Sequence, residues 1–194
     1  MNFKEIQNKL SKFSVGIAGA GGLGSNCAVA LVRCGIGHLI IADFDTVEPG
    51  NLNRQYYFRN QIGQYKVDAL KENLLRINPD LKIDIHKNKL DSKSLISTFN
   101  NVHVLVEAFD HAKQKEMVVE TALEAWPDRP LVMGIGMAGF GKTEILKIYV
   151  SGNLYICGDG TEEIGPNNPP IAPRVGIVAN MQADKTVELL LGIG

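Results

Sequence analysis

The sequence predicts an α/β fold: a doubly wound, Rossmann-like sheet that is parallel in its first half and has antiparallel strands later. Three observations support this prediction. Short apolar segments alternate with helical patterns from Ser14 to about Gly136. A glycine-rich turn follows the first apolar segment, and a hairpin pattern follows the last. Successive β-α-β units of this kind form a parallel sheet with helices on both faces.

The expected strands are short, apolar and mostly β-branched, as buried parallel strands usually are. They cover residues 14–18, 38–42, 82–86, 102–108 and 130–135. The expected helices between them cover residues 25–34, 64–77, 92–99 and 111–125. The second helix is the clearest, because it ends before Asn78-Pro79 and one face carries Val67, Leu70, Leu74 and Ile77.

The pattern changes after the last parallel strand. "KTEILKIYV" and "LYIC", joined by Ser151-Gly152-Asn153, predict an antiparallel hairpin. Residues 158–173 contain four prolines and three glycines, which predicts a mobile loop. Further helices are expected over residues 174–191 and, with an amphipathic pattern, over residues 1–13. We expect a single nucleotide-binding domain over 1–194.

Composition excludes several classes of protein. The 194 residues carry a net charge of −1, so no basic surplus indicates nucleic acid or an anionic membrane as a partner. No apolar run approaches the roughly 18 residues that span a bilayer, and the polar N-terminus lacks the apolar core of a signal peptide. Three cysteines without a C-x-x-C pair disfavour a disulfide framework and a structural zinc site. We expect a cytoplasmic protein.

The stretch "IAGAGGLGS" carries the dinucleotide-binding spacing Gly19-x-Gly21-x-x-Gly24, with Gly22 inside it. Backbone N–H groups at the start of the following helix would point at phosphate, and Asp43, at the end of the next strand, could accept from ribose hydroxyls. Alternatively, the glycines only permit tight strand–helix packing. The motif indicates a nucleotide without saying which one, and the four histidines form no obvious catalytic group for a dehydrogenase.

A polar segment after this strand favours a triphosphate over a dinucleotide. Arg and Lys side chains can clamp phosphate charges, and Mg²⁺ prefers carboxylates, water and phosphate oxygens. The cations are Arg54 and Lys66, and Asp45 together with Asp110, at the end of "VLVEAFD", could hold the metal. The other polar residues of the segment are Asn51, Asn53 and Gln55.

The motifs "GAGGLGS", "DFDTVEPGNLNRQ", "GQYK" and "AFD", in this order and spacing, resemble the ThiF/MoeB/HesA superfamily, which includes the ubiquitin-activating enzymes. The resemblance runs from about Val15 to the C-terminus and is strongest to short, zinc-less ThiF-type proteins of bacterial thiamine biosynthesis. It implies ATP-dependent adenylation of the C-terminal glycine of a small ubiquitin-like sulfur-carrier protein, with release of pyrophosphate. It also implies a homodimer and no zinc.

The resemblance also implies residue roles. Arg54, Lys66 and Asp110 are expected to be catalytic, with Asp110 and Asp45 as metal ligands. Asp43 is expected to hold the ribose. The expected phosphate site includes Gly19, Gly21, Gly22, Gly24, Asn51 and Gln55. A carboxylate nucleophile is already ionised at pH 7, so this reaction needs charge stabilisation and no general base.

Some features depart from the family pattern or leave alternatives open. His111 and Lys115 stand where relatives often have Asn and Arg, and the first 32 residues contain no arginine that could reach a partner subunit's site. Cys157, before the expected loop, is either a packed thiol or a nucleophile or persulfide carrier. The acceptor could be another ubiquitin-like carrier, a peptide or a tRNA-linked substrate. An NAD-binding dehydrogenase or nucleotide-sensing regulator is a more distant alternative.

Overall fold

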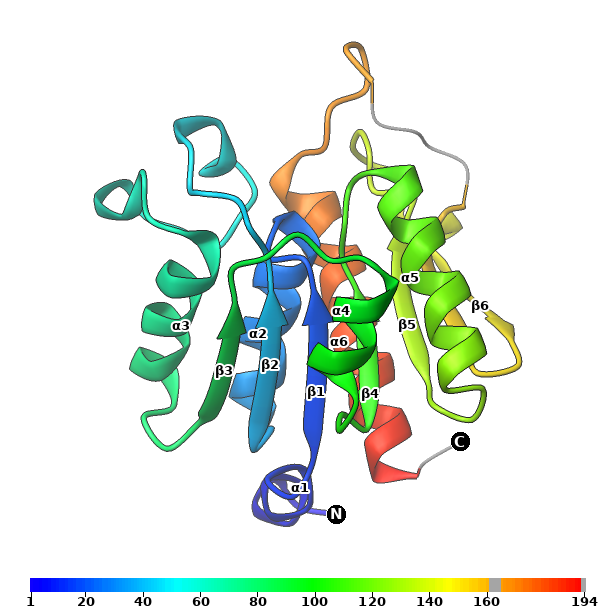
Figure 1. Ribbon diagram of the computed structural model, residues 1–194. Helices are drawn as coiled ribbons and strands as arrows, with labels where there is room; N and C mark the ends of the chain where they lie inside the picture. Colours follow the sequence, from blue (N-terminus) through cyan, green and yellow to red (C-terminus); the bar gives the residue numbers. More distant parts are fainter. Residues whose placement is uncertain (161–164, 193–194) are drawn as a thin grey trace.

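The computed structural model describes residues 1–160 and 165–192. In these residues, seven strands form one sheet in the order β3-β2-β1-β4-β5-β7-β6 (Figure 1). The strands are β1 (Ser14–Ala18), β2 (His38–Ala42), β3 (Lys82–His86), β4 (Val104–Glu107), β5 (Leu131–Ile135), β6 (Lys147–Ser151) and β7 (Leu154–Gly158). All neighbouring strands are parallel except β6, which runs antiparallel to β7.

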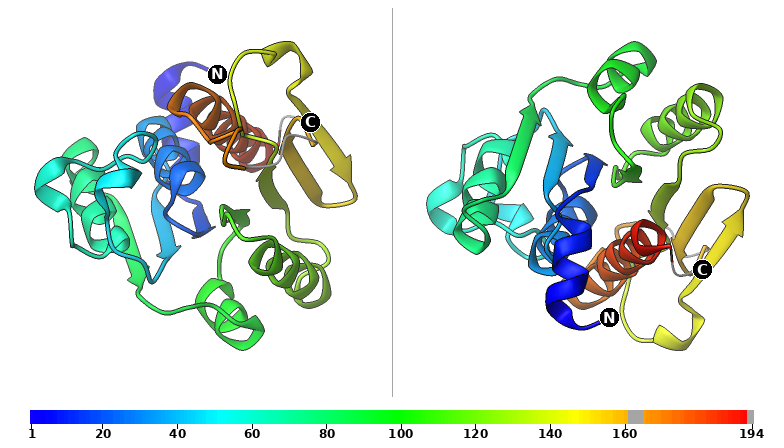
Figure 2. Two further views of the ribbon diagram at one scale, coloured as in Figure 1. Left: turned by 90° about the horizontal axis from the view of Figure 1, so that it is seen from above. Right: turned by 90° about the horizontal axis from the view of Figure 1, so that it is seen from below.

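Helices cover both faces of this sheet (Figure 2). They are α1 (Phe3–Leu10), α2 (Gly22–Cys34), α3 (Lys66–Ile77), α4 (Ser92–Phe99), α5 (Ala112–Ala125) and α6 (Ala172–Leu191). Short 3₁₀ turns cover Pro49–Asn51, Arg59–Gln61 and Thr143–Ile145.

Two apolar cores lie on either side of the sheet. The larger one packs α2, α3 and α6 against the sheet, around buried residues such as Ile17, Leu39 and Leu70. The smaller one packs α4 and α5 against the other face, around Phe99 and Leu105. Burying a large apolar side chain stabilises a fold by roughly 1.5–3 kcal/mol. The two cores therefore hold the sheet between its two helical layers.

The fold class predicted from the sequence is confirmed, and each expected strand and helix is present within a few residues. The predicted antiparallel hairpin is also present, since β6 runs antiparallel to β7. The chain passes from β5 to the outer edge, forms β6 there and returns, so that β7 lies parallel to β5. Helix α2 begins at Gly22 and not at residue 25, because the glycines of the turn themselves adopt the first helical turn.

The expected mobile loop at 158–173 lies partly outside the described residues, and its mobility stays a prediction. The described part contacts the segment after β5, where the Gly139 N–H donates to the Pro169 carbonyl at 3.0 Å. Buried Arg174 and Asp159 form an ion pair across the base of this loop. Among the described residues, no helix combines the length and the apolar character that a membrane crossing requires.

Candidate functional site

The candidate site is a cleft at the carboxyl ends of the central strands. The chain passes from β1 outward to β2 and β3 and then returns to β4 on the other side, so strand order reverses between β1 and β4. Ligands of open α/β sheets bind at such a reversal. A cavity of about 470 Å³ lies there. Nine predicted site residues line it: Gly19, Gly21, Gly22, Asp43, Asp45, Arg54, Gln55, Lys66 and Asp110.

Glycines shape one wall of the cleft. Gly19 has a φ of +103°, and a Cβ atom there would lie 2.9 Å from the Ala108 carbonyl oxygen. Gly24 does not line the cavity, and a Cβ atom at this position would overlap the Gly19 carbonyl oxygen. Gly24 therefore permits close packing of α2 on the turn. Gly21 and Gly22 border the cavity at the N-terminus of α2.

Asp43 stands at the end of β2, is 7% exposed and is already engaged by backbone N–H groups. Its Oδ2 accepts from the Ala20 N–H at 2.7 Å and its Oδ1 accepts from the Asp45 N–H at 2.8 Å. Burial raises the pKa of Asp43 above its ordinary value, although these two bonds and Lys66 lower it. Each carboxylate oxygen has a second lone pair, so Asp43 can still accept from a ligand hydroxyl.

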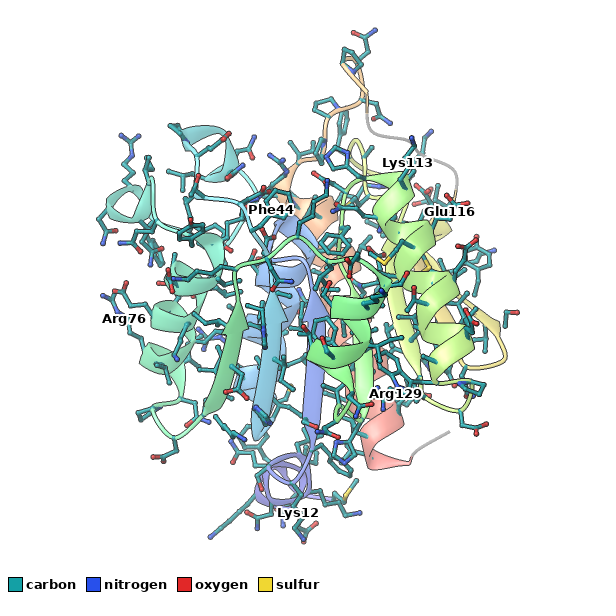
Figure 3. The ribbon with its side chains drawn as sticks, viewed as in Figure 1. Lys12, Phe44, Arg76, Lys113, Glu116 and Arg129 are labelled. Atoms are coloured by element: carbon teal, nitrogen blue, oxygen red, sulfur yellow. The ribbon has the colours of Figure 1, made fainter. Side chains whose placement is uncertain are left out.

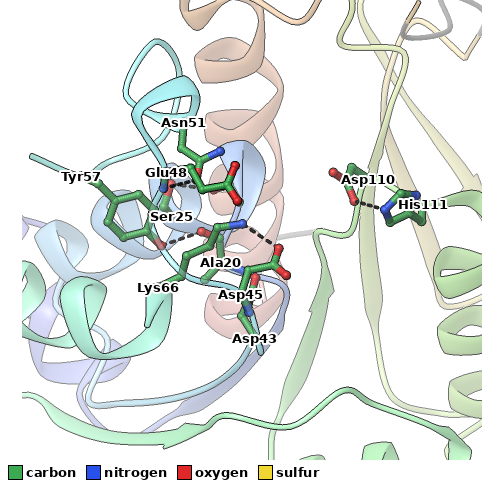
Figure 4. Close-up of polar contacts among 11 residues, drawn as sticks. Ala20, Ser25, Asp43, Asp45, Glu48, Asn51, Tyr57, Lys66, Asp110 and His111 are labelled. Carbon is green, nitrogen blue, oxygen red and sulfur yellow. Dashed lines mark hydrogen bonds and ion pairs between the residues drawn. The ribbon is translucent and has the colours of Figure 1, made fainter. Parts of the chain in front are cut away.

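The two predicted cations differ in their surroundings. Lys66 is buried at the start of α3, and its Nζ lies 2.8 Å from Asp45 Oδ2 (Figure 4). Arg54 is half-buried and donates to the Gly50 carbonyl and to Asn53 Oδ1 at 3.2 and 2.8 Å. Arg54 has no carboxylate partner among the salt bridges of residues 1–160 and 165–192. It is thus a cation available to a ligand.

The two predicted amide residues also differ. The Asn51 side chain accepts from the Glu48 N–H at 2.9 Å and stays outside the cavity lining, so its contact is within its own 3₁₀ turn (Figure 4). Gln55 lines the cavity, and its Oε1 atom is buried without a hydrogen-bond partner among the residues that the structure describes. A buried acceptor left unpaired costs roughly 1–3 kcal/mol, so a ligand donor at Gln55 would be favourable.

Asp110 lies at the mouth of the cleft, across from Asp45 (Figure 4). Its side chain is 71% exposed, and His111 Nε2 lies 3.7 Å from its Oδ1. In the part of the chain that the structure describes, no three His, Cys, Asp or Glu side chains form a metal-binding group. Between Asp43 and Asp45, Phe44 is 42% exposed and also lines the cleft; Figure 3 labels it above β2.

Sequence reasoning missed a buried ion pair behind the cleft. Glu107, the last residue of β4, is fully buried, and its Oε2 lies 2.7 Å from Lys115 Nζ on α5. Its Oε1 accepts from the Phe109 N–H at 2.7 Å, and Lys115 also donates to the Gly134 carbonyl at 2.8 Å. The pair therefore fixes the turn that leads to Asp110. The sequence feature that could have indicated this pair is the acidic residue at the end of the apolar segment "VLVE".

Cys157 is a buried thiol within the sheet. It lies on β7, between Gly134 of β5 and Ile148 of β6, and is fully buried. Burial raises its pKa to about 12, although Lys185 lowers it. The thiolate is the reactive form of cysteine, so these surroundings favour the interpretation as a packed thiol.

Comparisons with known proteins agree with this architecture. The chain is 34% identical over 137 residues to ubiquitin-like modifier-activating enzyme 5 of Caenorhabditis briggsae, covering 71% of this chain and 29% of the relative. It is 28% identical over 199 residues to the adenylyltransferase and sulfurtransferase MOCS3 of Culex quinquefasciatus, covering 96% and 43%. The chain thus spans less than half the length of these curated relatives.

Solved structures share the fold. The E. coli tRNA N6-threonylcarbamoyladenosine dehydratase TcdA in complex with ATP superposes with a TM-score of 0.86 at 17% identity, covering 97% of this chain and 90% of that chain. A model described as the ThiF family matches residues 2–194, almost the whole sequence. The chain therefore belongs to the ThiF family.

Proposed function

We propose that this chain adenylates the C-terminal glycine of a small ubiquitin-like sulfur-carrier protein with ATP and releases pyrophosphate. A carboxylate oxygen of the glycine attacks the α-phosphorus of ATP, and the bond from this phosphorus to the pyrophosphate oxygen breaks. The products are an acyl-adenylate and pyrophosphate. The observation that carries the proposal is the meeting of the glycine turn, Arg54 and Lys66 around one cleft.

The residues of the cleft match the needs of this reaction. Negative charge builds up on phosphate oxygens as the pyrophosphate leaves, and fixed cations stabilise that charge. Lys66 stands at the start of α3, and Arg54 lies beside the glycine turn. Both can therefore bind and orient phosphates. The carboxylate nucleophile is ionised at neutral pH, so the cleft needs no general base.

The donors and acceptors of the cleft also fit a nucleotide. The glycine wall leaves open space, since a Cβ atom at Gly21 would meet only the Gln55 amide nitrogen, at 3.8 Å. The unpaired Gln55 oxygen can accept from a ligand, and Asp43 can accept from ribose hydroxyls. Asn51 would act indirectly, by shaping the turn that presents Arg54.

Mg²⁺ fits the carboxylates present, because it usually binds through phosphate oxygens and only one or two protein carboxylates. Asp110 would hold it, and Asp45 is a second candidate whose present partner is Lys66. When bound, Mg²⁺ would neutralise phosphate charge and help to orient the leaving group.

The relatives support an acceptor of this class, since their names describe a ubiquitin-like modifier-activating enzyme and an adenylyltransferase and sulfurtransferase. The finer assignment to a sulfur carrier of thiamine thiazole biosynthesis rests on the resemblance to short, zinc-less ThiF-type proteins. We further propose that the protein acts in the cytoplasm as a homodimer. An acceptor other than a carrier protein is an outcome of the test below.

The decisive experiment is ATP–pyrophosphate exchange with purified carriers. We expect exchange with a sulfur carrier that ends in glycine, and none with the same carrier after removal of its terminal glycine. Other ubiquitin-like carriers and peptides serve as competing acceptors. If exchange occurs with one of these acceptors and not with the sulfur carrier, that acceptor is the substrate. NAD binding in place of ATP binding would contradict adenylation altogether.

A further inference from the structure

A tyrosine outside the cleft holds the glycine turn from behind. Tyr57 is 5% exposed, and its hydroxyl donates to the Ala20 carbonyl at 2.6 Å (Figure 4). Ala20 is fully buried, and its N–H donates to Asp43 at 2.7 Å. The Ala20 backbone is therefore fixed on both sides, by Asp43 through its N–H and by Tyr57 through its carbonyl.

The next peptide unit is held in the same way. The Gly21 carbonyl accepts from the Ser25 hydroxyl at 2.6 Å and from the Ser25 N–H at 3.0 Å. The Ser25 hydroxyl oxygen in turn accepts from the Tyr56 N–H at 3.0 Å. Two successive carbonyls of the turn are thus held by hydrogen bonds. The Tyr57 hydroxyl holds the Ala20 carbonyl directly, and the Tyr56 N–H holds the Gly21 carbonyl indirectly, through the Ser25 hydroxyl.

Holding these carbonyls sets the direction of two N–H groups. In a planar trans peptide, the carbonyl of one residue and the N–H of the next point in opposite directions. Because the Ala20 carbonyl points toward Tyr57, the Gly21 N–H points away from Tyr57. Because the Gly21 carbonyl points toward Ser25, the Gly22 N–H points away from Ser25. Neither N–H donates to another backbone group within the described ranges. Both residues line the cleft at the start of α2, where N–H groups attract anions.

We propose that Tyr57 and Ser25 are positioning residues that present the Gly21 and Gly22 N–H groups to a phosphate of the bound nucleotide. This inference rests on the proposed function. The presence of a tyrosine at position 57 supports this role, because an apolar side chain could fill the same buried position. It would leave the Ala20 carbonyl without this donor, and the turn would then be free to rotate that peptide.

The test compares ligands with and without phosphate. Tyr57→Phe keeps the ring and removes only the hydroxyl. We expect its Kd for ATP and AMP, measured by calorimetry, to rise about tenfold, the loss expected for a misaligned charge-assisted hydrogen bond. The Kd for adenosine should stay within about twofold, because adenosine has no phosphate to misplace. The matched control is Tyr155→Phe on β7, outside the cavity lining, which removes a hydroxyl that makes no hydrogen bond among the described residues and should change none of these values.

A uniform loss of affinity for all three ligands would show a general structural role and overturn the proposal, as would unchanged ATP affinity. Ser25→Ala removes the hydroxyl donor to the Gly21 carbonyl and the acceptor for the Tyr56 N–H, while the Ser25 N–H still reaches that carbonyl. It should show a selective loss in the same direction, so the proposal stays testable if Tyr57→Phe does not fold. Failure of the proposed function is a different result. In that case the wild-type protein itself would bind no ATP and would exchange no pyrophosphate.

Discussion

Removing the ammonium group of Lys115 should lower the free energy of unfolding, because it leaves the buried charge of Glu107 without a counter-ion. The Glu107 carboxylate is fully buried, and Lys115 Nζ lies 2.7 Å from it. In Lys115→Met, which keeps a long side chain, the carboxylate retains the Phe109 N–H as a donor but loses its counter-ion. Breaking one side of a buried pair costs about 3–5 kcal/mol. For a chain of this size, 3 kcal/mol corresponds to a Tm lower by roughly 6–12 °C.

This destabilisation should depend on pH in one direction. Burial raises the pKa of Glu107 above its ordinary value of 4.5, while Lys115 lowers it, so the loss of Lys115 raises the pKa further. A carboxyl group whose pKa is raised in the folded state stabilises the fold while it is protonated. That contribution is complete below about pH 4.5 and is lost as the pH rises through the raised pKa. Lys115→Met should therefore lose more stability at pH 8 than at pH 5.

Urea unfolding at the two pH values measures this effect, with fluorescence of the single tryptophan, Trp126, as the signal. The control is Glu107→Gln, alone and combined with Lys115→Met, because the glutamine keeps an acceptor for the Phe109 N–H without the charge. The double variant should be more stable than Lys115→Met at pH 8. Equal losses at both pH values, or a double variant less stable than Lys115→Met, would refute the reasoning.

Three further predictions concern the cleft and the thiol. ATP with Mg²⁺ should raise the Tm and NAD should not; an equal or larger shift with NAD in the same thermal-shift assay would contradict adenylation. Arg54→Ala and Lys66→Ala should each slow pyrophosphate exchange about a hundredfold, the loss of roughly 3 kcal/mol of charge stabilisation, whereas the exposed control Arg76→Ala (Figure 3) should not. Cys157 should resist iodoacetamide at pH 8 in the folded protein, and Cys157→Ser should retain exchange; rapid native labelling would argue against a packed thiol.

The fold could be predicted because periodicity and glycine chemistry act locally. The face formed by Val67, Leu70 and Leu74 and the spacing from Gly19 to Gly24 each identify an element without its neighbours. The direction of β7 could not be predicted in this way. A hairpin pattern reports only that β6 and β7 are antiparallel to each other, and either strand could pair with β5.

The sequence indicates most of the residues that line the cleft, Gly24 and Asn51 excepted, but not the contacts among them. Asp43 and Asp45 follow β2, and parallel strands end at one edge of the sheet, which places them beside the glycine turn. Lys66 belongs to the start of α3, and only the motif "GQYK" indicated that it joins them. No local signal says that Lys66 is bound to Asp45. Likewise, nothing in the spacing identifies Tyr57, which contacts Ala20 from 37 positions along the chain. Such contacts depend on how two loops pack against each other, and sequence periodicity does not predict loop packing.

The charges around the cleft are compatible with the proposed phosphate site in a protein of net charge −1. Asp43 is engaged by two backbone N–H groups, and Asp45 faces Lys66. Behind them, Glu107 faces Lys115. These three carboxylates, in and behind the cleft, are thus each matched by donors of the protein, and they repel an incoming phosphate less than their number suggests.

The charged and polar groups that are not matched in this way lie on two sides of the cleft, positive on one side and negative on the other. On one side are Arg54, without a carboxylate partner within residues 1–160 and 165–192, and the N-terminus of α2 with the Gly21 and Gly22 N–H groups. On the other side is Asp110, exposed at the mouth. A phosphate chain alone would satisfy only the first group. A phosphate chain that carries a divalent cation would satisfy both, which is the arrangement expected if ATP binds here together with the proposed Mg²⁺.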